Sequence, residues 1–179
     1  MSGPDIETLA SRIVYQNRWM QVRENKTRLR DGTEGIYGFV EKGNFVIIAP
    51  ICGGVVHLVE QFRYPIGRRQ WEFPQGGWDI AAKPLDVAHG ELLEEAGLIA
   101  GSMKEAGELY PLYGTVTQKY RIFLASDLRP GVPAREATEQ DMITRAFPLA
   151  EFERMIVQGE IQDAGTVASF GLLRIKGMI

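Results

Sequence analysis

One stretch, residues 76–98, constrains the fold of this chain more than any other: it reads GGWDIAAKPLDVAHGELLEEAGL. Pro84 suits the first turn of a helix and Gly97 suits the position just past its end, so the stretch predicts a helix over residues 84–96. Apolar side chains recur along one face of that helix, which is wide enough to pack on a sheet. These side chains are Leu85, Ala88, Leu92 and Ala96.

Three glutamates share a neighbouring face of the predicted helix. At roughly 100° per residue, Glu91, Glu94 and Glu95 fall within an arc of about 100°. Like charges spaced three or four residues apart repel by about 0.2–0.5 kcal/mol per pair. The glutamates therefore either lie in solvent, as on an ordinary helix surface, or are neutralised by something positive.

The composition narrows the class of protein. A chain of 179 residues with 45% hydrophobic and 24% charged residues predicts one soluble globular domain with a small extension. Cys52 is the only cysteine, so no disulfide can form within the chain and a cytoplasmic location is expected. The N-terminus lacks the pattern of a signal peptide, and no apolar run approaches the roughly 20 residues that span a bilayer. With a net charge of −3 and mostly scattered basic residues, nucleic-acid partners are not expected.

Hydrophobic periodicity predicts a mixed α/β arrangement. Two further helices are expected at residues 149–157 and 164–175, the second capped by Asp163. Strands are expected before and after the central helix, which favours a mixed sheet with helices on its faces. The predicted strands are residues 11–14, 20–24, 26–29, 35–41, 44–49, 55–61, 70–73, 108–112, 121–125 and 142–147. Residues 128–139 carry two prolines and a glycine and predict a mobile surface loop.

The residues near the glutamates suit phosphate chemistry. Clustered carboxylates favour hard divalent cations, with Mg²⁺ as the first candidate and Mn²⁺ as the alternative. Arg63, Arg68 and Arg69 precede the glycines, and the arginine fork matches phosphate oxygens. One of Arg68 and Arg69 is expected to be solvated. Together these features indicate attack by water on a phosphoanhydride.

These residues also carry a family resemblance. The stretch resembles the Nudix box, G-x5-E-x7-R-E-U-x-E-E-x-G-U with U aliphatic, and matches it in register at Gly76, Glu91, Leu92, Glu94, Glu95, Gly97 and Leu98. The box is degenerate, because Ala82 stands in place of its first glutamate and Gly90 in place of its arginine. EQFRYP, WEFPQGG and YGTVTQKYRIFLA extend the resemblance to the branch of ADP-ribose pyrophosphatases and nucleoside-diphosphate-sugar hydrolases. It covers roughly residues 40–179.

The resemblance implies a fold and an assembly. The expected fold is the Nudix α/β/α sandwich, with a mixed sheet between helices and an N-terminal extension of antiparallel strands. Residues 1–42 would form the extension and residues 43–179 the Nudix domain. Relatives on this branch pair through their N-terminal strands, so a homodimer is implied.

The resemblance also implies roles for individual residues. The metal site would comprise Glu91, Glu94, Glu95 and Gly76. Candidates for contact with substrate are Arg63 at the diphosphate, Glu72, Arg69 and Trp78. In this branch a glutamate from a late loop often acts as the catalytic base; Glu139 is the first choice here and Glu136 the second, acting with Glu95.

The implied activity is a Mg²⁺-dependent pyrophosphohydrolase. It would cleave a nucleoside diphosphate linked to another moiety, such as ADP-ribose or a nucleotide sugar, into a nucleoside monophosphate and a phosphorylated product. The losses at Ala82 and Gly90 leave open a catalytically impaired nucleotide-binding module. A third alternative is a Nudix enzyme that acts on nucleoside triphosphates or dinucleoside polyphosphates.

Overall fold

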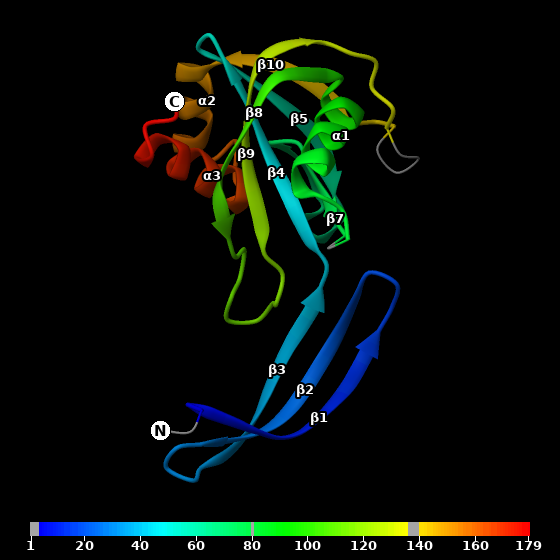
Figure 1. The fold of residues 1–179 in the computed structure, drawn as a ribbon, viewed down its shortest axis with the longest axis vertical. Coiled ribbons are helices and arrows are strands. Elements are labelled where there is room, and N and C mark those ends of the chain that lie inside the picture. The colour runs from blue at the N-terminus through cyan, green and yellow to red at the C-terminus, as the bar shows by residue number, and fades with distance from the viewer. Residues whose placement is uncertain (1–3, 80, 136–139) are drawn as a thin grey trace. The chain divides into compact units, whose positions relative to one another are not determined.

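The computed structural model describes residues 4–79, 81–135 and 140–179. The chain divides into two compact units (Figure 1). The first comprises residues 1–43 and 110–119, and the second comprises residues 44–109 and 120–179.

The first unit is built on a three-stranded antiparallel sheet. Its strands follow in the order β1 (Ile6–Gln16), β2 (Met20–Leu29) and β3 (Glu34–Lys42). The predicted strands 20–24 and 26–29 are one strand, because Asn25 keeps its place in the pairing with both neighbours. The β2–β3 turn contains Gly32 at φ +88°, and the Asp31 side chain accepts a hydrogen bond from the Thr33 N–H at 2.9 Å.

Residues 110–119 belong to this first unit. Val40 N–H donates to the Thr115 carbonyl at 2.8 Å, and Thr117 N–H donates to the Val40 carbonyl at 3.0 Å. The predicted strand at residues 108–112 is correct only for Glu108 and Leu109, because the backbone beyond Leu109 forms turns beside β3.

Large apolar side chains of the first unit are strongly exposed. Ile36 in β3 is 68% exposed and Trp19, between β1 and β2, is 63% exposed. Others exposed on the same strands are Ile6, Ile13, Val14, Tyr15, Leu29 and Tyr37. A sheet of three strands needs a covered apolar face for independent stability. The described residues of the first unit therefore leave this apolar surface uncovered.

The second unit is organised around a seven-stranded mixed sheet within the described residues. Its main path runs β10-β5-β4-β9-β8, with β6 paired to β5 and β7 paired to β4. The β4–β9 pair is parallel and the other pairs are antiparallel. The strands are β4 (Asn44–Cys52), β5 (Val55–Arg63), β6 (Arg68–Glu72), β7 (Gln75–Trp78), β8 (Leu98–Leu109), β9 (Tyr120–Pro130) and β10 (Ile143–Pro148). A short 3₁₀ turn, Tyr64–Ile66, joins β5 to β6.

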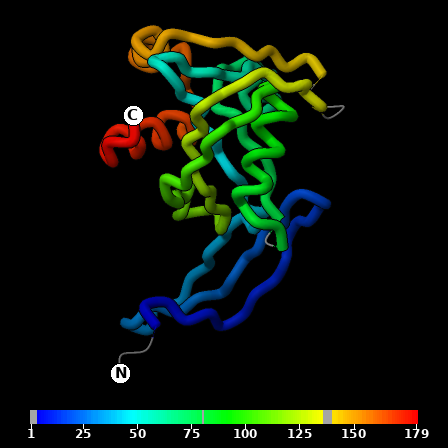
Figure 2. The backbone as a smooth tube through the Cα atoms, turned by 45° about the horizontal axis from the view of Figure 1, so that its top comes forward, coloured from blue at the N-terminus to red at the C-terminus, as the bar shows by residue number. Residues whose placement is uncertain are grey.

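Helices cover both faces of this sheet (Figures 1 and 2). Val46 and Ile48 of β4 pack in one apolar cluster with α1 (Pro84–Ala96). The intervening Ile47 and Ala49 pack in the other cluster, which includes residues of α2 (Leu149–Val157) and α3 (Ala164–Ile175). Because alternate residues of a strand point to opposite faces, α1 covers one face of the sheet and α2 and α3 cover the other. The expected sandwich of a sheet between helices is confirmed.

The ends of α1 follow from its sequence. Pro84 occupies the start, where its missing N–H has no helical acceptor to lose. Gly97 takes φ +64° just past the end, and its N–H closes the last turn on the Leu93 carbonyl at 3.0 Å. The predicted bounds of all three helices are confirmed. No helix in the described part of the chain is long and apolar enough to cross a membrane.

Candidate functional site

The α1 helix presents its glutamates beside the sheet. Ala88 and Leu92 are fully buried against the strands, which fixes the rotation of the helix. Glu95 is only 1% exposed, and its Oε2 accepts a hydrogen bond from the Gln75 N–H of β7 at 2.9 Å. Glu91 and Glu94 are half-buried.

Gly76 makes room for one of these carboxylates. A Cβ atom built on Gly76 would lie 1.9 Å from Glu91 Cδ and 2.0 Å and 2.2 Å from its two oxygens. Such distances are far inside van der Waals contact, so the Glu91 carboxylate occupies the space that any other residue at position 76 would fill. The structure therefore brings together Gly76, Glu91 and Glu95, as expected for one site.

The donor set fits a hard divalent cation in chemical type. Carboxylate oxygens are the preferred ligands of Mg²⁺ and Mn²⁺. Among the described residues, no three His, Cys, Asp or Glu side chains already converge on a single point. Mg²⁺ commonly takes one or two carboxylates and completes its shell with water and substrate phosphate. The fit is thus to a partly open site rather than to an all-protein cage.

A cleft of about 520 Å³ is lined by residues of β5, β6, β7 and the start of α3. This volume suits a small-molecule ligand. Its wall includes Gln75, the residue whose N–H binds Glu95. The lining residues are Arg63, Pro65, Ile66, Arg68, Gln70, Glu72, Gln75, Gln162, Asp163 and Ala164.

Arg63 and Glu72 form an ion pair in the wall of this cleft. Arg63 Nε lies 3.1 Å from Glu72 Oε2, and its Nη2 binds Oε1. Glu72 also accepts from Gln61 Nε2 at 2.6 Å. Burial raises the pKa of the Glu72 carboxyl, and the Arg63 guanidinium opposes that rise without cancelling it. Glu72 therefore orients Arg63, whose Nη1 takes part in neither bond.

A chain of hydrogen bonds fixes the residue after Glu72. The Phe73 N–H donates to Thr166 Oγ1 at 2.9 Å, and that hydroxyl donates to Asp163 Oδ2 at 2.7 Å. Asp163 also caps α3 by accepting from the Thr166 N–H at 2.7 Å, which confirms the predicted cap. Thr166 is fully buried, so the start of α3 holds the segment between β6 and β7 in place.

Arg69 and Trp78 are engaged within the protein. Arg69 donates to Glu60 Oε2 at 2.7 Å and to Asp141 Oδ2 at 2.7 Å. It also donates to the backbone carbonyls of Glu60 and Asp141. Trp78 is 9% exposed and donates from its indole to the Ala82 carbonyl at 2.9 Å. A role for either in substrate contact stays a prediction. Arg68, by contrast, lines the cleft.

The expected base residues, Glu139 and Glu136, lie outside the described residues. The residues on either side of them are tied together, since Gln140 Nε2 donates to the Arg135 carbonyl at 2.7 Å. Arg135 in turn reaches the Glu95 carbonyl with its Nε at 3.3 Å. Arg135 and Gln140 therefore lie close to each other near the end of α1.

Several contributors to this region were not predicted as site residues: Gln61, Gln70, Gln75, Thr166 and Arg135. Gln61 contacts Glu72 11 positions away, Gln75 contacts Glu95 20 positions away, and Thr166 contacts Phe73 93 positions away. Local spacing carries no signal for such pairs. Asp163, predicted as the N-cap of α3, also lines the cleft.

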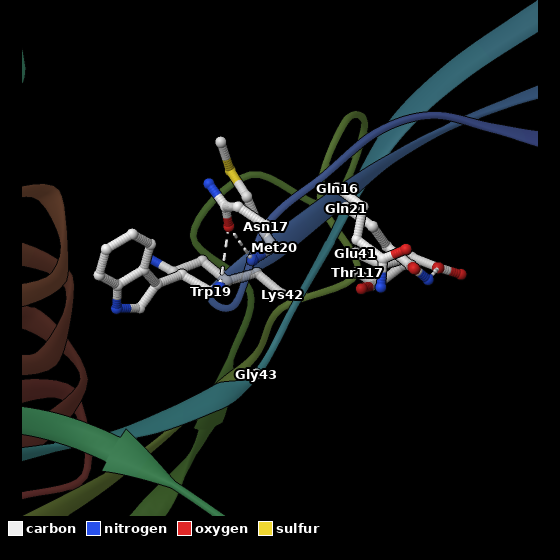
Figure 3. A pocket seen from close by; sticks show the side chains of 9 residues that line it. All are labelled: Gln16, Asn17, Trp19, Met20, Gln21, Glu41, Lys42, Gly43 and Thr117. Atoms are coloured by element: carbon white, nitrogen blue, oxygen red, sulfur yellow. Dashed lines mark hydrogen bonds between the residues drawn. The ribbon is translucent and has the colours of Figure 1, made fainter.

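The first unit holds a separate hollow of about 450 Å³ (Figure 3). Asn17 shapes its rim, because its Oδ1 accepts from the N–H groups of Trp19 and Met20 at 2.8 and 2.9 Å. The Arg18 guanidinium carbon lies 4.0 Å from the centroid of the Trp19 ring. Other residues lining the hollow are Gln16, Gln21, Glu41, Lys42, Gly43 and Thr117.

Comparison with known proteins agrees with the fold. Residues 44–169 match the NUDIX domain, and residues 6–40 match the nucleoside diphosphate sugar hydrolase N-terminal domain. The chain belongs to the Nudix hydrolase family. The expected family membership is confirmed.

Two relatives match along nearly the whole chain. An ADP-ribose pyrophosphatase of Mycobacterium tuberculosis is 32% identical over 181 residues, covering 99% of this chain and 86% of that protein. An ADP-ribose pyrophosphatase of Bacillus subtilis is 24% identical, covering 98% and 96%. A crystal structure of an ADP compounds hydrolase superposes with a TM-score of 0.87 at 21% identity, covering 99% of this chain and 98% of that one. That structural likeness supports the fold.

Proposed function

We propose that this enzyme hydrolyses the diphosphate of a nucleoside diphosphate linked to another moiety, with ADP-ribose or a nucleotide sugar as substrate. The observation that carries the proposal is the meeting of two features at β7. A cleft lined by arginines lies on one side of Gln75, and the Gln75 N–H binds the buried Glu95 of the glutamate helix. The relatives named ADP-ribose pyrophosphatase and GDP-mannose pyrophosphatase support the same class of substrate.

The proposed cofactor is Mg²⁺, with Mn²⁺ as a substitute. Glu91, Glu94 and Glu95 would hold the cation beside Gly76, with substrate phosphate completing its shell. When bound, such a cation neutralises phosphate charge and lowers the pKa of a coordinated water. Gly76 contributes by leaving room for the Glu91 carboxylate.

The chain's own groups would bind the diphosphate and move the proton. Arg63 is held by Glu72, so its guanidinium is orientated before substrate arrives. Arg68 is a second cation in the same cleft. The base is Glu139, with Glu136 second, and it accepts the proton of the attacking water. The products are a nucleoside monophosphate and a phosphorylated partner.

An assay separates this function from the alternatives. The purified enzyme with Mg²⁺ should convert ADP-ribose, GDP-mannose or another nucleotide sugar into a nucleoside monophosphate and a sugar phosphate. Glu95→Gln and Glu94→Gln should lower the rate by about 10²-fold or more, because a metal-ligand charge is lost. Glu153→Gln on α2 is a matched control, since Glu153 pairs on the surface with Arg174.

Three outcomes would contradict or redirect the proposal. A wild-type enzyme that binds these compounds yet hydrolyses none would be a nucleotide-binding module, as the losses at Ala82 and Gly90 allow. Release of inorganic pyrophosphate from triphosphates would favour the third activity. Glu139→Gln should reduce kcat about 10²-fold. If it left kcat unchanged, Glu136 would be assigned as the base instead.

We infer that the functional form is a homodimer that pairs through the first unit, in the cytoplasm. Supporting this are the exposed apolar side chains of its three strands, among them Ile36 at 68% exposure. Light scattering of wild type should give twice the chain mass. Ile36→Asp should shift the protein toward monomer, whereas Leu85→Asp on α1 should not. A monomeric wild type, or a dimeric wild type whose mass Ile36→Asp leaves unchanged, would overturn the pairing.

A further inference from the structure

The connection from β9 to β10 runs against the C-terminal end of α1. The Gly131 N–H donates to the Gly97 carbonyl at 2.8 Å. Pro133 lies next to Gly97, since its Cδ is 3.1 Å from where a Cβ of Gly97 would be. This connection is therefore packed on the last turn of the helix before it reaches Arg135.

Arg135 completes these contacts from a half-buried position. Its Nε donates to the Glu95 carbonyl at 3.3 Å, and its Nη2 donates to Thr144 Oγ1 at 2.9 Å. Its Nη1 donates to the Met142 carbonyl. Thr144 Oγ1 in turn donates to the same Glu95 carbonyl at 3.2 Å. One helical carbonyl thus receives two outside donors, and a guanidinium ties them together.

The electrostatics of α1 explain why a cation is useful there. The C-terminal end of a helix carries partial negative charge, which favours basic residues in the last turn. The last turn of α1 has no basic residue and instead contains Glu94 and Glu95. Both carboxylates therefore stand at the end of the helix that repels them. Arg135 brings a positive charge to that end from a different segment of the chain.

We propose that Arg135 is a positioning residue for the glutamate end of α1. Through the Glu95 carbonyl and Thr144 it holds the last turn, and with it the Glu94 and Glu95 side chains, in the arrangement that receives the divalent cation. The inference rests on the proposed metal site. Removal of Arg135 should therefore weaken metal affinity itself, even when no substrate is present.

Metal titration tests this role without relying on activity. Calorimetric titration of the full-length protein with Mn²⁺, in the absence of substrate, should show Arg135→Gln binding about 10-fold more weakly than wild type, the range known for residues that orient metal ligands. Arg135→Lys should recover part of the affinity, since a lysine keeps the charge but loses the fork. Thr144→Val should weaken binding in the same direction.

The matched control is Arg129→Gln. Arg129 is exposed on β9 in the strand that leads into the same connection, and its loss should leave Mn²⁺ affinity unchanged. Hydrogen exchange adds a local readout: in Arg135→Gln the Gly97 amide, which bonds to the Leu93 carbonyl, should exchange faster than in wild type.

The possible results separate this inference from the proposed function. If Arg135→Gln lowers the thermal midpoint but binds Mn²⁺ as wild type does, Arg135 serves stability alone and the inference is overturned. If wild type itself binds no Mn²⁺, the proposed metal site is lost and the inference with it. If wild type binds, Arg135→Gln binds more weakly and Arg129→Gln does not, the positioning role stands.

Discussion

The Arg63 guanidinium and the Glu72 carboxylate face each other across neighbouring strands, with Nε 3.1 Å from Oε2. The two residues are unequal partners. Glu72 is 2% exposed, whereas the Arg63 side chain is 39% exposed. The carboxylate depends on the guanidinium for its charge balance, while the guanidinium can also be hydrated.

This inequality predicts an asymmetric effect of mutation. Arg63→Met leaves a buried carboxylate without its charged partner and should lower the free energy of unfolding at neutral pH by about 1–3 kcal/mol. Glu72→Gln keeps an acceptor and leaves Arg63 to water, so it should cost clearly less. Urea unfolding of both variants measures the difference. Equal losses would contradict the interpretation.

The raised pKa of Glu72 predicts a pH dependence of stability. Burial, the larger cause, lifts its pKa above the ordinary value of 4.5 despite Arg63. At pH values between 4.5 and the raised pKa of Glu72, the folded protein binds more protons than the unfolded chain. The stability contributed by this group therefore falls as pH rises. From pH 4.5 upward, the thermal midpoint of wild type should fall relative to that of Glu72→Gln. Above the raised pKa of Glu72, the pH curves of the two proteins should run parallel. Parallel curves throughout would show that the pKa is not raised.

The adjacent glycines of β7 offer a matched pair of variants. In Gly76→Ala the new methyl would lie 1.9 Å from Glu91 Cδ and must displace the carboxylate, whereas a methyl at Gly77 meets nothing within 4 Å. We expect Gly76→Ala to weaken Mn²⁺ affinity by about 10–100-fold, and Gly77→Ala to leave it near that of wild type. Calorimetric titration measures both. If both variants bind alike, Glu91 is not a ligand.

The hydrogen bond from the Phe73 N–H to the Thr166 hydroxyl predicts how mutation of Thr166 changes stability and substrate KM. Thr166→Val leaves the Phe73 N–H without its acceptor at a fully buried position and should lower the free energy of unfolding by about 1–3 kcal/mol. Thr166→Ser keeps the hydroxyl and should retain substrate KM, which the valine variant should raise. Steady-state kinetics and denaturant unfolding measure the two effects. A serine variant that raises KM as much as valine would assign the effect to packing.

The sequence predicted the parts of the fold that depend on local signals. Pro84 and Gly97 bound α1, and Asp163 caps α3, because each acts on backbone groups within a few residues. The strand Leu98–Leu109 was missed because glycines interrupt its pattern. Gly107 sits at φ +147° where the pairing with β9 shifts register, and such irregularities hide the period of a strand.

The candidate site was predictable only in part. The glutamates of α1 and Arg63 stood out by spacing and by family resemblance. Their supporting partners did not, because Gln75 reaches Glu95 and Arg135 reaches the same residue only after the chain has folded. The orientation of Arg63 by Glu72 likewise depends on the pairing of β5 with β6. Contacts between segments that are distant in the sequence cannot be predicted from the residues next to each of them.

The burial of β4 on both faces of the sheet has a consequence for how the second unit opens. Val46 to Ala49 are fully buried, and β4 pairs with β5, β7 and β9, so its amides lie between two helical layers and three strands. Release of these amides to solvent requires both apolar clusters to separate at once. They should therefore exchange only through global unfolding, which makes β4 the slowest reporter of the whole second unit.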